Sequence, residues 1–128
     1  MLAVALAAVS LSSTPKSCPS ASVVAATLGT KASSPKLTKN PYGITCLYGT
    51  GAFAPKVEFQ QDTSATFAKG EKAAAAQLPV VKVAHLGKAA WTLKSGGSLY
   101  VLTGSYQIKI LAILTAVPKL EALARKLL

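Results

Sequence analysis

The chain has 128 residues, of which 51% are apolar, and its 14 lysines and arginines outnumber 4 acidic residues to give a formal net charge of +10. This length suffices for one domain with a buried core and excludes a second domain. The composition argues against specific nucleic-acid recognition, because Arg125 is the sole arginine and no aromatic residues are interleaved with basic ones. The dispersed lysines predict a soluble domain or, alternatively, a basic protein that associates weakly with an anionic polymer or a membrane surface.

The first 13 residues form an apolar run of small side chains that becomes polar at its end. The run is shorter than the roughly 20 apolar residues that span a bilayer. It is typical of the apolar region and cleavage zone of a secretory signal, with Ala5-Leu6-Ala7 or Ser10-Leu11-Ser12 as cleavage motifs. No basic residue precedes it, so a buried core helix stays the alternative. We therefore expect a signal-like apolar segment over residues 1–13 and a single α+β domain over residues 14–128.

Residue patterns predict four elements in the first part of this domain. Gly29 and Pro79 are expected to end helices, because glycine adopts the left-handed conformation of a helix C-terminus and proline cannot continue a helix. Residues 30–41, rich in lysine, serine and proline, have the composition of a loop. The four elements are a helix over residues 21–28, strands over 42–48 and 56–61, and a helix over 65–77.

Residues 89–114 contain three apolar runs separated by turn residues, and the rest of the predicted fold is organised around them. Trp91 and Leu93 alternate with polar neighbours, which is the pattern of a strand with one buried face. Residues 98–102 and 106–111 repeat the pattern. The stretch therefore predicts a three-stranded meander.

Two further segments complete the predicted fold. Residues 80–88 lead into the meander as a short strand or an extended loop, and residues 117–128 have the apolar spacing of an amphipathic helix. The fold class is therefore α+β: a twisted antiparallel sheet of about five strands, with helices packed on one face and one disulfide.

The chain contains two cysteines, Cys18 and Cys46. Together with a single histidine they cannot supply a four-ligand zinc site. In an exported protein a disulfide is the expected outcome, and closing this loop would stabilise the fold by roughly 3 to 4 kcal/mol. The alternative is a pair of buried free thiols in a cytosolic protein.

Candidate catalytic residues are few and scattered. His85 is the only histidine, and no serine, cysteine or carboxylate lies near it in the sequence to complete a relay. The glycine-containing segments 49–51 and 95–98 predict turns rather than phosphate-binding loops, because neither precedes a helix. The acidic residues are too dispersed to predict a carboxylate pair: they are Glu58, Asp62, Glu71 and Glu121. We therefore predict a non-enzymatic protein with no cofactor and no metal.

Several short motifs resemble a known class of proteins. They are a Cys-Pro pair before a short helix ending in Leu-Gly, then Ile-Thr-Cys-x-Tyr, His-Leu-Gly-Lys-Ala-Ala-Trp, Ser-Leu-Tyr-Val-Leu-Thr-Gly and a terminal Leu-Glu-Ala-Leu-Ala-Arg-Lys helix. Over residues 18–128 this set resembles small extracytoplasmic domains of actinobacterial envelope proteins, many of them lipoproteins of unknown function. It is also similar to the extracellular sensor domains of mycobacterial-type serine/threonine kinases.

The resemblance implies a disulfide between Cys18 and Cys46 within an α+β fold. In lipoprotein members an acylated cysteine directly follows an apolar box, whereas Cys18 follows Pro15-Lys16-Ser17. The chain therefore looks secreted rather than lipid-anchored.

These observations predict a non-enzymatic, exported binding or sensing module that is secreted or associated with the cell envelope. Its partner would be an unknown envelope ligand or protein. Association of a basic protein with an anionic polymer or a membrane surface is the alternative function, and a hydrolase with an unrecognised site is a remote one.

Overall fold

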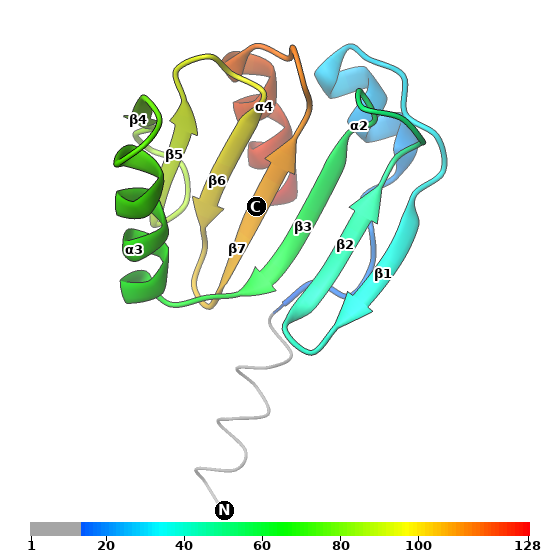
Figure 1. Cartoon of the computed structure of the whole chain (residues 1–128). Helices are drawn as coiled ribbons and strands as arrows, with labels where there is room; N and C mark the ends of the chain where they lie inside the picture. The colour runs from blue at the N-terminus through cyan, green and yellow to red at the C-terminus, as the bar shows by residue number, and fades with distance from the viewer. Residues whose placement is uncertain (1–13) are drawn as a thin grey trace, which may run out of the picture.

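The computed structural model describes residues 14–128, which form one seven-stranded antiparallel sheet and three α-helices (Figure 1). The elements in chain order are α2 Ala21–Leu28, β1 Lys36–Asn40, β2 Gly43–Leu47, β3 Lys56–Gln61, α3 Ser64–Ala75, β4 Val80–Lys82, β5 Ala89–Leu93, β6 Ser98–Leu102, β7 Tyr106–Leu111 and α4 Val117–Leu127. The strands lie in the order β1-β2-β3-β7-β6-β5-β4. The predicted α+β class is confirmed, but the sheet has seven strands rather than about five. The predicted signal-like segment over residues 1–13 lies outside the described residues.

The two strands beyond the expected five form the edges of the sheet. β1 pairs with β2, and β4 pairs with β5. The composition of residues 30–41 predicts a loop, and the structure corrects this over residues 36–40. Every residue of β1 is exposed, so the strand is held by backbone pairing rather than by a buried apolar face. Its Lys36 and Lys39 are typical of edge strands, where charge discourages pairing with another chain.

Long-range pairing between β3 and β7 joins two meanders into one sheet. β5, β6 and β7 are consecutive antiparallel neighbours, which confirms the meander predicted over residues 89–114. β3 then pairs with β7, with Val57 opposite Ile110 and Phe59 opposite Ile108. All four side chains are buried, so this junction forms the centre of the core.

Helices α2 and α4 lie on one face of the sheet and enclose the main core (Figure 1). α4 contributes Leu120, Leu123 and Ala124, whose spacing places them on one side of the helix. α2 contributes Val24 and Leu28. The inward-facing residues of the central strands complete this core: Ile44, Cys46, Val57, Phe59, Leu99, Val101, Ile108 and Ile110.

Helix α3 packs on the opposite face, so the prediction that the helices share one face is wrong. Its Phe67 meets Trp91 and Leu102 in a second buried cluster. Ala90, the neighbour of Trp91 in β5, belongs to the main core, and adjacent residues of a strand point to opposite faces. Trp91 is therefore a core residue, as predicted, but of the smaller core beneath α3. It stacks on Tyr100 with the ring centroids 3.9 Å apart.

A disulfide joins Cys18, which precedes α2, to Cys46 in β2, and this confirms the predicted bond. The two Cα atoms are 5.7 Å apart. Nearby, the phenol of Tyr48 donates a hydrogen bond to the carbonyl oxygen of Pro19 at 2.6 Å. The start of α2 is thus held to the end of β2 by one covalent bond and one hydrogen bond. This attachment matters because a helix of 8 residues is too short to be stable alone.

Burial raises the pKa of Tyr48 to about 12, compared with 10.0 for an exposed phenol. The folded state therefore favours the protonated phenol more than the unfolded state does. We expect this contribution to the free energy of unfolding to be complete below pH 10 and to be lost between pH 10 and pH 12. Urea unfolding measured between pH 10 and pH 12 should show that the free energy of unfolding falls less steeply with pH for Tyr48→Phe than for the wild type. An equal pH dependence of the free energy of unfolding in the two proteins would contradict a raised pKa of Tyr48.

Candidate functional site

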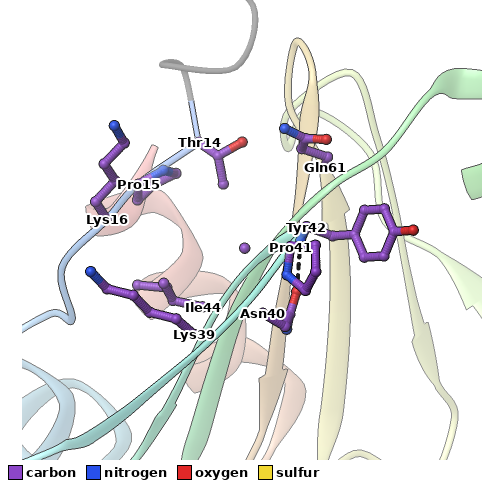
Figure 2. A pocket seen from close by; sticks show the side chains of 10 residues that line it. Thr14, Pro15, Lys16, Lys39, Asn40, Pro41, Tyr42, Ile44 and Gln61 are labelled. Carbon is purple, nitrogen blue, oxygen red and sulfur yellow. Dashed lines mark hydrogen bonds between the residues drawn. The ribbon is translucent and has the colours of Figure 1, made fainter.

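A hollow of about 300 Å³ lies between residues 14–16 and the β1–β2 hairpin (Figure 2). Its walls come from three segments far apart in the sequence: residues 14–16, residues 39–44 and Gln61 at the end of β3. The hollow is open to solvent, and one of its lining residues, Thr14, has a buried hydroxyl with no hydrogen-bond partner in residues 14–128.

The tight turn between β1 and β2 shapes one side of the hollow. Asn40 accepts the backbone N–H of Tyr42 through its side-chain oxygen at 2.8 Å, and Pro41 lies between them. Asparagine and proline are both favoured in turns, because one bonds to the backbone two residues on and the other restricts φ. Gly43 also lines the hollow, and a Cβ atom there would collide with the carbonyl oxygen of Phe59 in the neighbouring strand. A glycine at this position allows the close approach of the two backbones.

Three uncharged polar side chains line the hollow: Thr14, Asn40 and Gln61. Thr14 is only 7% exposed, and its hydroxyl has no hydrogen-bond partner within residues 14–128. In Figure 2 this hydroxyl lies on the side of the hollow that Gln61 occupies. A buried hydroxyl without a partner is unfavourable, so a ligand toward which the Thr14 side chain rotates would gain a hydrogen bond.

Lys16 and Lys39 give one rim of the hollow a positive charge. Figure 2 shows both lysines on the same side, opposite Tyr42, whose ring points away from the other lining residues. No acidic residue is present among the ten that line the hollow. The local field therefore favours an anion. The floor and walls between the polar groups are apolar and come from Ile44, Pro15 and Pro41.

The residues singled out for chemistry in the sequence lie elsewhere and do not converge. His85 is exposed in the loop between β4 and β5, with a positive φ of 59°. Each carboxylate has its own partner: Glu71 pairs with Lys82, Glu121 with Arg125, Asp62 accepts from Gln107, and Glu58 lies near Lys56 and Lys109. No cluster of three or more potential metal ligands occurs in residues 14–128. Cys18 and Cys46 do come together, and they form a disulfide whose role is structural.

On the sheet face that α3 packs against, the strands beyond this helix carry a continuous row of polar and aromatic side chains. Across neighbouring strands, Tyr100 lies opposite Lys109, Lys109 opposite Glu58, and Glu58 opposite Thr45. The Lys109 ammonium lies 5.5 Å from the Tyr100 ring centre and 3.9 Å from the Glu58 carboxylate, to which Thr45 donates at 3.5 Å. These groups contact one another, so the row contributes to the stability of the sheet.

The fold and its cross-link define this chain as a disulfide-containing α+β protein, and such a bond indicates folding in an oxidising, extracytoplasmic compartment. Of the three helices in residues 14–128, none is long and apolar enough to cross a membrane. No protein-family model matches the sequence, and comparisons with curated proteins and with solved structures return no match. The resemblance to actinobacterial envelope domains therefore stays a prediction.

The residues of the hollow are not evident from the sequence. Thr14, Asn40 and Gln61 are separated by more than twenty residues from one another and form no motif. They meet because the β1–β2 turn and the end of β3 lie at the same end of the sheet, where Gly43 pairs with Gln60. The only signal in the sequence is Asn40-Pro41-Tyr42-Gly43, which predicts a turn between two strands once β1 is recognised as one.

Proposed function

We propose that the protein is an exported binding module that holds a small, hydroxyl-rich anion, such as a sugar acid or a sugar phosphate, in the hollow at the β1–β2 hairpin. The observation that carries this proposal is the unpaired, buried Thr14 hydroxyl beside two lysines in a concave site free of acidic residues. Binding rather than turnover is proposed, because the site contains no general acid, general base or nucleophile with an activating partner.

The polar groups of the hollow favour hydroxyl groups on the ligand. A threonine hydroxyl and a glutamine carboxamide can each both donate and accept hydrogen bonds. The side-chain oxygen of Asn40 is occupied by the Tyr42 N–H, which leaves its NH₂ group as a donor. A hydroxyl group both donates and accepts, so it is the ligand group that satisfies Thr14 and Gln61 simultaneously.

The charge and size of the site narrow the ligand class further. Lys16 and Lys39 are point charges that suit a carboxylate or a phosphate. A volume of about 300 Å³ accommodates one small molecule and is at the lower end for ligand pockets. The apolar surface of Ile44 and the prolines offers contact to the C–H groups of such a ligand. An anionic saccharide unit of the cell envelope combines these properties, and the disulfide supports an extracytoplasmic location.

Calorimetric titration with glucuronate, glucose and acetate tests the proposal, because the three probes separate charge from hydroxyl groups. We expect saturable binding of glucuronate and much weaker binding of glucose and of acetate. Glucose 6-phosphate in a fourth titration distinguishes a preference for phosphate from one for carboxylate.

Matched variants test whether the binding occurs in this hollow. Lys16→Gln with Lys39→Gln should weaken glucuronate binding about tenfold, since two partly exposed ion pairs contribute roughly 1 to 2 kcal/mol together. Thr14→Val should weaken binding while leaving charge unchanged. Lys88→Gln, an exposed lysine outside the hollow, is the control and should bind like the wild type. Equal affinities for all four proteins would contradict the proposed site.

A further inference from the structure

The end of the sheet opposite the hollow carries exposed apolar residues on its loops. Five connections lie there: residues 29–35, 48–55, 76–79, 94–97 and 112–116 (Figure 1, upper end). Strand pairing places them together, because Leu111 is opposite both Lys56 and Ser98, and Val80 is opposite Leu93. The exposed large apolar side chains on these connections are Phe53, Leu78, Ile113 and Leu114.

Leu114 is the most unusual of these residues. Its side chain is 86% exposed, and its φ of 66° lies in the left-handed region that bulky residues rarely adopt. Glycine or asparagine would fit this turn without strain and without exposing an apolar side chain. Neither stability nor solubility of the free protein explains a leucine here, whereas an apolar partner does.

The same end is positively charged. The five connections contain Lys31 and Lys94 and no acidic residue. Lys36, Lys56 and Lys119 lie at the adjoining starts of β1, β3 and α4. None of the four carboxylates lies on the five connections: Glu58 is in β3, Asp62 is near the end with the hollow, and Glu71 is in α3. Glu121, near the start of α4, lines the same surface depression as Lys94 and pairs with Arg125.

Apolar loop tips surrounded by lysines match the chemistry of an anionic lipid bilayer. The tips can enter the interface between headgroups and acyl chains, while the lysines contact anionic headgroups. We propose that this end of the sheet, defined by the five connections, docks on an anionic membrane surface. The hollow lies at the opposite end of the sheet, so a docked protein presents it away from the membrane.

Vesicle binding tests this proposal independently of the ligand site. Wild-type protein should co-sediment with vesicles of phosphatidylcholine mixed with phosphatidylglycerol, and far less with phosphatidylcholine alone. Leu114→Asn should weaken this binding about tenfold, because it removes an inserted apolar side chain. Lys94→Gln and Lys31→Gln should each weaken it about fivefold and reduce its dependence on salt.

Two controls separate docking at this end from lost folding and from a general loss of exposed apolar surface. Asparagine tolerates the left-handed conformation, so Leu114→Asn should melt at or above the wild-type temperature. Leu128→Asn removes an exposed leucine at the far end of α4 and should bind vesicles like the wild type. Binding that Leu114→Asn leaves unchanged, or that Leu128→Asn weakens equally, would overturn the proposal, as would absence of binding to the anionic vesicles. Each variant should retain glucuronate binding.

Discussion

Replacing both cysteines by alanine should lower the melting temperature by about 10 to 20 °C. The Cys18–Cys46 bond spans 28 positions in the sequence, and closing a loop of this size stabilises a protein by about 3.5 kcal/mol in the chain-entropy model. For a domain of this size each kcal/mol corresponds to roughly 3 to 6 °C. The double substitution leaves no unpaired thiol, so its effect reports the loss of the bond more cleanly than a single substitution.

Thermal unfolding followed by circular dichroism measures this effect, with the reduced wild-type protein as the reference. The reduced wild type and Cys18→Ala/Cys46→Ala should melt at similar temperatures, since both lack the bond. Native protein that reacts with an alkylating agent before reduction would contradict the disulfide and the oxidising compartment. A double variant as stable as the oxidised wild type would show that the bond contributes little to folding.

Gly43→Ala should destabilise the fold by about 3 kcal/mol or more. A Cβ atom at this position would meet the backbone carbonyl of Phe59, and backbone cannot move aside as a flexible side chain can. The collision would separate β2 from β3 where Gly43 pairs with Gln60. Urea unfolding at neutral pH measures the change in the free energy of unfolding.

Gly70→Ala is the matched control for this substitution. Gly70 lies in the middle of α3, is exposed, and a Cβ atom there would have no neighbour within 4 Å. Alanine should therefore stabilise the helix by about 0.5 to 1 kcal/mol. If the two variants changed stability in the same direction, close packing at Gly43 would not be the cause.

The elements that could be predicted from the sequence are those with a buried face. β7 alternates buried Ile108 and Ile110 with polar residues, and α4 places Leu120, Leu123 and Ala124 on one side. β5 and β6 are short apolar runs between turns, and they are buried on both faces. Burial leaves such a pattern because each inward position must be apolar. The sequence of β1 has no such pattern, because all of its residues are exposed and the strand is held to β2 by backbone pairing.

The side of the sheet that each helix covers could not be read from periodicity. α3 buries only Phe67, and nothing in its sequence distinguishes one sheet face from the other. The hollow could not be predicted for a related reason: strand pairing brings Asn40 and Gln61 to the same end of the sheet, and Thr14, which lies outside the sheet, is distant from both in the sequence. The disulfide was predictable, since the chain has two cysteines and a signal-like start.

Amide chemical-shift mapping with glucuronate tests the central proposal most directly. We predict small shifts on the loop of residues 112–116 and saturating shifts of the backbone amides of the non-proline residues that line the hollow: Thr14, Lys16, Lys39, Asn40, Tyr42, Gly43, Ile44 and Gln61. The Lys16→Gln/Lys39→Gln variant should show the same shifts only at higher concentration. Saturating shifts confined to another part of the chain, or no saturation at all, would contradict a ligand site at the β1–β2 hairpin.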